Sequence, residues 1–91
     1  MADHAQVTVE FFGVPRQRAG RAELVVEGAN VAELLAAVEH ACPGLKGLVR
    51  PDGRLPLHYL LSIDGQRFVT DMAEALPPGT RILLLSADAG G

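Results

Sequence analysis

The first apolar residues of the chain alternate with polar ones at a period of two. This pattern predicts a strand over residues 7–12, with one face formed by Val7, Val9 and Phe11 and the other by Thr8, Glu10 and Phe12. Gly13 and Pro15 interrupt the alternation, so residues 13–20 are expected to form a loop. Residues 21–27 resume it and predict a hairpin partner whose Leu24 and Val26 face inward.

After Gly28 the apolar spacing becomes that of a helix. Asn30 is a favourable N-cap, and Glu33, three residues later, stands in the capping-box position. The apolar face that follows consists of Val31, Leu34, Leu35, Val38, Ala41 and Cys42. Pro43-Gly44 ends the pattern, because proline disfavours helical geometry in the residue before it. The sequence therefore predicts one helix of about three turns.

The second half of the chain is rich in turn residues and short apolar runs. Residues 45–56 are expected to be irregular, and residues 70–76 to hold one helical turn. Strands are predicted over 57–63, 66–69 and 80–86, the second at an edge and the last with Ile82 and Leu84 inward.

This order leaves one main helix to cover one face of a mixed sheet of four to five strands. We therefore predict an α+β fold of the β-grasp type. Its first and last strands are expected to run parallel near the centre of the sheet.

Composition excludes several classes of function. Ninety-one residues suit a single domain, predicted over 1–91. Eight basic and eleven acidic residues give a formal charge of −3, which argues against nucleic acid or an anionic membrane as partner. Cys42 is the one cysteine, and no Cys/His spacing is typical of zinc, so no disulfide or metal site is expected. With no signal peptide pattern or membrane-length apolar run, a cytoplasmic location is expected.

Five short segments occur in an order that points to a known family: Val9–Gly13, Asn30–Leu35, Pro43–Leu45, Ile63–Gly65 and the final Gly90-Gly91. With them the chain resembles the ubiquitin-like sulfur carriers. This family includes the small subunit of molybdopterin synthase (MoaD), the nearest match, and the thiamin sulfur carrier (ThiS). The resemblance covers nearly the whole chain, from Val7 to Gly91.

The resemblance implies a chemistry at the chain end. A ubiquitin-activating-type enzyme would use ATP to adenylate the carboxylate of Gly91, and a persulfide would convert it to a thiocarboxylate that donates sulfur. Gly90 has no side chain, so the chain next to this carboxylate would be narrow enough to enter an enzyme site. Residues 87–91 are expected to form a flexible arm, and residues 1–5 to be disordered. The chain would be a co-substrate or small synthase subunit without a tightly bound cofactor. Its second partner would be a sulfur-accepting synthase.

One departure leaves the pathway open. Ser86-Ala87-Asp88-Ala89 precedes the diglycine, where small subunits of molybdopterin synthase usually carry apolar or proline residues. Molybdenum cofactor synthesis is the leading interpretation. Delivery of sulfur to thiamin, cysteine or another metabolite, a protein modifier joined through Gly91, and a plain binding module are the alternatives.

A carrier must also dock its body on the enzyme. Freezing a five-residue arm costs roughly 5–10 kcal/mol, at about 1–2 kcal/mol per residue, so an apolar patch is needed to offset it. The alternation predicts this patch on the sheet face away from the helix, formed by Phe12, Val25, Leu60, Leu83 and Leu85. The remaining candidates have ordinary explanations: Cys42 is expected in the core, and His4, His40 and His58 are scattered. Solvated loop positions explain Arg16, Arg18 and Arg21 better than contact with an acidic partner.

Overall fold

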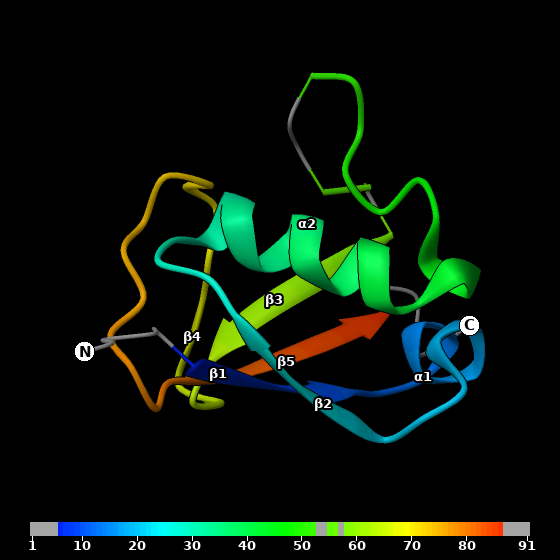
Figure 1. The fold of residues 1–91 in the computed structure, drawn as a ribbon, viewed down its shortest axis with the longest axis horizontal. Coiled ribbons are helices and arrows are strands. Elements are labelled where there is room, and N and C mark those ends of the chain that lie inside the picture. Colours follow the sequence, from blue (N-terminus) through cyan, green and yellow to red (C-terminus); the bar gives the residue numbers. More distant parts are fainter. Residues whose placement is uncertain (1–5, 53–54, 57, 87–91) are drawn as a thin grey trace.

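A computed structural model describes residues 6–52, 55–56 and 58–86, and it contains one five-stranded sheet. The strands are β1 (Gln6–Phe11), β2 (Glu23–Glu27), β3 (Tyr59–Ile63), β4 (Arg67–Phe68) and β5 (Arg81–Ser86), in the spatial order β2-β1-β5-β3-β4. Helix α2 (Val31–Ala41) lies across one face (Figure 1). Strands β1 and β5 are parallel, and every other pair is antiparallel. The predicted β-grasp fold, with its first and last strands adjacent at the centre, is confirmed.

The predicted loop over 13–20 is wrong, because residues Val14–Ala19 form helix α1. Pro15 stands in its first turn, where the missing N–H and the fixed φ of proline are compatible with a helix. Gly20 ends the helix in a left-handed conformation, and its N–H donates to the Arg16 carbonyl at 3.0 Å. α1 lies beyond the end of β5, beside the short 3-10 helix η1 (Pro43–Leu45) (Figure 1).

The helical turn predicted over 70–76 is also wrong. Within the segment the Glu74 N–H donates to the Asp71 carbonyl at 3.1 Å, which forms an isolated turn and not a helix, and other backbone groups bond to the N-terminus of α2. The N–H groups of Val31 and Ala32 donate to the carbonyls of Glu74 and Met72 at 3.0 and 2.9 Å, and Leu76 donates to Ala29 at 2.9 Å. The first N–H groups of a helix have no partner within it. This segment supplies partners for two of them.

Asn30 caps α2 as predicted, since its Oδ1 accepts from the Glu33 N–H at 2.9 Å. In a capping box, the glutamate side chain accepts from the N–H of the N-cap residue, but here it accepts from the residue before Asn30. Glu33 Oε1 accepts from the Ala29 N–H at 2.9 Å.

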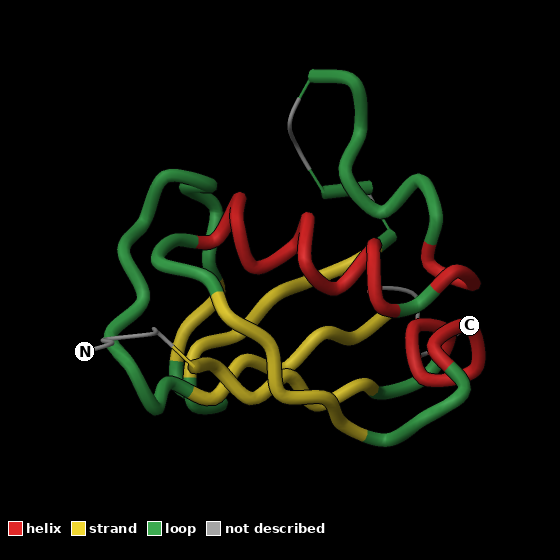
Figure 2. Tube along the Cα trace, in the orientation of Figure 1, coloured by secondary structure: helices red, strands yellow, loops and turns green. Residues whose placement is uncertain are grey.

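The core lies between α2 and the inner face of the sheet (Figure 2). The predicted inward residues of β1 and β5 are all at most 1% exposed: Val7, Val9, Phe11, Ile82 and Leu84. α2 contributes Val31, Leu34, Leu35 and Val38, whereas Ala41, predicted on the same face, is exposed. Leu24 and Val26 are only half-buried, because β2 is an edge strand. Strands β3 and β4 are shorter than predicted, and Leu57 lies outside the described residues.

An ion pair between Arg67 and Glu74 joins the edge strand β4 to the segment that caps α2. The hydrogen bond from the Arg67 guanidinium lowers the pKa of the Glu74 carboxyl below its usual value. A lowered folded-state pKa stabilises the fold above the unfolded-state pKa, and this contribution is lost as the pH falls through the folded-state value.

We therefore expect Glu74→Gln to lower the urea midpoint slightly at neutral pH, as is typical of a surface pair. The difference from the wild-type chain should vanish in acid, and urea titrations between about pH 3 and pH 7 would measure it. A difference that is independent of pH would show that Glu74 acts through something other than its charge.

Candidate functional site

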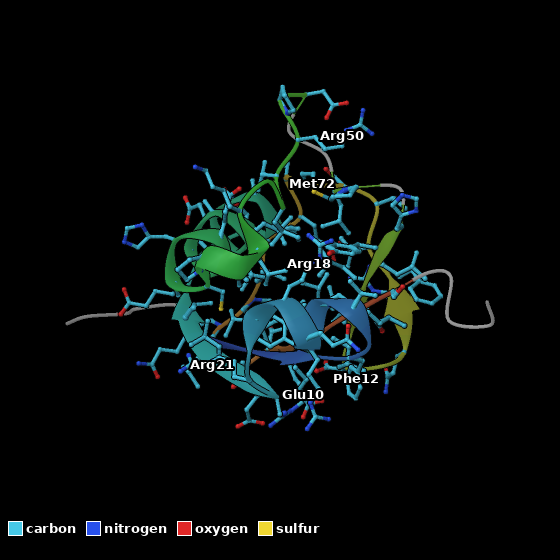
Figure 3. The ribbon with its side chains drawn as sticks, turned by 90° about the vertical axis from the view of Figure 1, so that its right-hand side faces the viewer. Glu10, Phe12, Arg18, Arg21, Arg50 and Met72 are labelled. Carbon is cyan, nitrogen blue, oxygen red and sulfur yellow. The ribbon has the colours of Figure 1, made fainter. Side chains whose placement is uncertain are left out.

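The face of the sheet opposite α2 carries the predicted docking residues, and we call it the open face. The cross-strand pairs Thr8–Val25, Glu10–Leu83 and Leu60–Leu85 lie on it. Phe12 follows β1, where its N–H donates to the Leu84 carbonyl at 2.9 Å. Figure 3 shows Phe12 on the same side as Glu10.

All five predicted patch residues are therefore brought to one face. Phe12 and Val25 are 43% and 55% exposed, while Leu60, Leu83 and Leu85 are half-buried. Large apolar side chains grouped on one exposed face are typical of an interaction surface.

Phe68 is a residue of this face that the sequence analysis missed. It pairs with Ser62 on β3, and Ser62 in turn pairs with Leu83 on β5, so all three side chains share the open face. Phe68 is 60% exposed, more than either Phe12 or Val25. The strand predicted over 66–69 has two adjacent apolar residues, Phe68 and Val69, so alternation could not assign Phe68 to a face. The Asp64-Gly65 turn, which sets the register with β3, was the available signal.

Charged side chains cross the open face between the apolar ones. Arg81 on β5 forms ion pairs with Glu10 on β1 and with Glu23 on β2, the latter at 3.8 Å between Nη1 and Oε1. Surface pairs of this kind contribute little to stability. Within an interface they favour one partner and one orientation over others.

The predicted reactive residues, Gly90 and Gly91, lie outside the described residues, as do residues 1–5 and the other residues of the arm. The described chain ends at Ser86, the last residue of the central strand β5. A cleft of about 370 Å³ lies next to Ser86, between α1, the segment after η1 and the segment that enters β3. Arg18, Lys46 and His58 line it.

The other candidates are spread apart. Cys42 is a free thiol buried in the core, as predicted. His40 is exposed on α2 and His58 lies at the cleft, while His4 is outside the described residues. In the described part of the chain, no three His, Cys, Asp or Glu side chains are grouped as metal ligands would be. Nor does any helix there have the length and apolarity needed to cross a membrane.

Solved structures share this arrangement of sheet and helix. Small archaeal modifier protein 1 (SAMP1) from Haloferax volcanii has a TM-score of 0.80 and 24% identity, over 94% of this chain and 99% of its own. CysO, in the Amycolatopsis orientalis BexX/CysO complex, has a TM-score of 0.78 and 24% identity, and the match covers 93% of this chain and 99% of its own. A putative molybdopterin converting factor subunit 1 from Pyrococcus furiosus has a TM-score of 0.70 and 23% identity, and the match covers 90% of this chain and 97% of its own.

These matches define the class of fold: the chain is a ubiquitin-like β-grasp protein, as its sequence predicts. Its structural neighbours are ubiquitin-like modifiers and sulfur carriers. No family model and no curated protein sequence matches the chain.

Proposed function

We propose that this protein is a sulfur carrier that cycles between a carboxylate and a thiocarboxylate at Gly91. The observation that carries the proposal is the path of β5. This strand occupies the centre of the sheet, presents Leu83 and Leu85 on the open face, and leads directly into the segment that ends in Gly90-Gly91. The predicted docking residues Leu83 and Leu85 and the proposed reactive Gly91 are therefore only a few residues apart in the chain.

The chemistry requires a partner, because a carboxylate is a poor electrophile. An α-carboxyl group titrates at about 3.3–3.7 and is ionised at neutral pH. In the proposed cycle a carboxylate oxygen of Gly91 attacks the α-phosphorus of ATP on a ubiquitin-activating-type enzyme, and pyrophosphate leaves. The terminal sulfur of a persulfide then displaces AMP from the acyl carbon. A thiol cleaves the resulting acyl disulfide, so that a disulfide forms on the donor and the thiocarboxylate remains on Gly91.

For the acceptor, we propose the large subunit of a molybdopterin synthase as the first partner to test. The likeness to a putative molybdopterin converting factor subunit supports this choice. The CysO neighbour, solved in complex with BexX, supports a carrier that works with a separate protein. Thiamin, cysteine or another sulfur metabolite is the alternative destination.

A second candidate function is a protein modifier joined through Gly91 to a lysine of a target. The similarity to small archaeal modifier protein 1 favours it. Both functions begin with adenylation of the same carboxylate and use the same docking step, so their difference lies in the nucleophile that follows.

Intact mass spectrometry separates these functions. The chain would be incubated with its activating enzyme, ATP and a persulfide sulfur donor. A carrier gains the increment for replacement of oxygen by sulfur, and a modifier appears in higher-mass conjugates when target proteins are added. An unchanged mass, with no pyrophosphate exchange, would contradict both.

The open face gives a separate prediction. We expect Leu85→Asp to weaken binding to the activating enzyme about 10- to 150-fold, because burial of a leucine side chain is worth about 1.5–3 kcal/mol. Leu85 is half-buried, so the variant should fold. Leu84→Asp is the matched control on the same strand, and it should unfold because Leu84 is 0% exposed in the core.

Calorimetric titration and a thermal melt would measure both properties. Unchanged binding by a folded Leu85→Asp variant would show that the open face is not the docking surface.

A further inference from the structure

The cleft beside Ser86 is a separate feature from the open face. One wall is formed by α1 through Val14 and Arg18, and the opposite wall by Pro56 and His58 ahead of β3. Its volume of about 370 Å³ is in the range of small binding sites. It therefore suits a few side chains of a partner better than a whole helix.

The lining of the cleft is basic and apolar. Its charged or titratable nitrogen groups are those of Arg18, Lys46 and His58, and none of the described residues that line it is Asp or Glu. The whole chain carries a formal charge of −3, so the local charge is opposite to that of the molecule. Val14, Pro56 and Tyr59 are half-buried and supply the accessible apolar surface of the cleft. Leu45 and Leu48, each 2% exposed, lie beneath it in the core.

Close contacts hold one wall of the cleft in place. A Cβ added to Gly44 would stand 1.9 Å from the Arg18 carbonyl oxygen, so α1 and η1 meet backbone to backbone. Gly47 lines the cleft with a φ of 92°, a conformation that glycine adopts readily. Its N–H donates to Glu39 Oε2 at 2.7 Å. These contacts fix the side of the cleft formed by α1 and residues 44–47, and a wall that is already ordered lowers the entropic cost of binding.

We propose that this basic cleft receives an acidic loop of the activating enzyme, one that also carries an apolar side chain. The inference rests on the proposed function. An enzyme that encloses the chain end must contact the body where β5 ends, and Ser86 lines the cleft at that point. Carboxylates of the loop pair with Arg18 and Lys46, and its apolar side chain packs on Val14 and Pro56, which are half-buried. This second contact complements the open face and sets the direction in which the arm enters the enzyme.

Charge reversal tests the proposal. Arg18→Glu and Lys46→Glu are compared with Arg21→Glu, which makes the same change in net charge at an exposed arginine outside the lining. Dissociation constants would be measured with the purified ubiquitin-activating-type enzyme of the same organism. We expect each cleft variant to bind about 10- to 100-fold more weakly and Arg21→Glu to change less than about 3-fold. The difference should shrink at about 0.5 M salt.

Two further measurements locate the effect. In the wild-type chain the amide resonances of Gly47 and Leu48 should shift when the enzyme is added, and in Lys46→Glu they should shift less. Arg18→Gln, which removes the charge without reversing it, should show an intermediate affinity. A thermal melt confirms that each variant is folded.

Three outcomes would overturn the inference. Equal affinities for the cleft variants and the Arg21→Glu control would leave the cleft without a role in docking. Tighter binding by the cleft variants would indicate that the acidic segment of this chain that contains Asp88 occupies the cleft and competes with the enzyme. A wild-type chain that neither binds the enzyme nor supports pyrophosphate exchange would contradict the proposed function itself.

Discussion

Deletion of Gly91 is expected to abolish the gain of sulfur while leaving the thermal melt nearly unchanged. Gly91 follows the last strand by five positions, and the last residue of a domain usually contributes little to its stability. The proposed reaction, in contrast, is expected to need the acyl carbon at one fixed distance from the body. Intact mass after incubation with enzyme, ATP and sulfur donor measures the first effect, and calorimetry the second.

An extended chain is the matched control for this deletion. One alanine added after Gly91 keeps every residue of the protein but moves the terminal carboxylate by one position. We expect the same loss of sulfur transfer and the same melt. Sulfur transfer by the extended chain would show that the position of the carboxylate is not recognised, and a large loss of stability in either variant would assign the segment a structural role.

Gly44→Ala is the substitution expected to affect the fold most. The added Cβ would stand 1.9 Å from the Arg18 carbonyl oxygen and 3.0 Å from its carbon. These are backbone atoms, so no rotamer change can relieve the contact, and α1 must separate from η1. Overpacking of this kind costs about 1–3 kcal/mol or more. At about 4–8 °C per kcal/mol for a domain of this size, the melting temperature should fall by roughly 5–20 °C.

Gly20→Ala serves as the control for Gly44→Ala. Gly20 has no atom within 4 Å of an added Cβ, but its φ is 74°, so the cost is conformational only, about 1 kcal/mol. Thermal melts of both variants would compare the cost of the backbone clash at Gly44 with the cost of the positive φ at Gly20. A smaller effect at Gly44 than at Gly20 would mean that α1 and η1 separate easily, and the walls of the cleft would then not be rigid.

Local patterns account for the parts of the fold that were predicted. The period-two alternation over 7–12 and 80–86 assigns each side chain to a face without knowledge of its neighbours. For that reason the five patch residues were placed together before the register was known. The helix after Asn30 followed in the same way from its cap and its spacing. The pattern does not assign Phe68 to a face, because Phe68 and Val69 are adjacent apolar residues and do not alternate.

The two wrong assignments have a common cause. Pro15 interrupts the strand pattern, but in the first turn it also suits a helix, and packing against η1 favours the helix over a loop. Residues 70–76 have some helical character in sequence. In the structure, two of their carbonyls accept hydrogen bonds from the N–H groups of Val31 and Ala32 at the N-terminus of α2. Both choices depend on residues far away in the chain.

By itself, the sequence determined the strands, the main helix, the faces of the strands and the composition of the chain end, because periodicity and capping act within a few residues. Only the tertiary structure decided that α1 exists, that Phe68 joins the open face and that a basic cleft opens beside Ser86. The cleft is lined by four separate parts of the chain: Val14 and Arg18, residues 45–48, Pro56 with His58 and Tyr59, and Ser86. Such a site depends on contacts between distant segments, and no local pattern encodes which segments will meet.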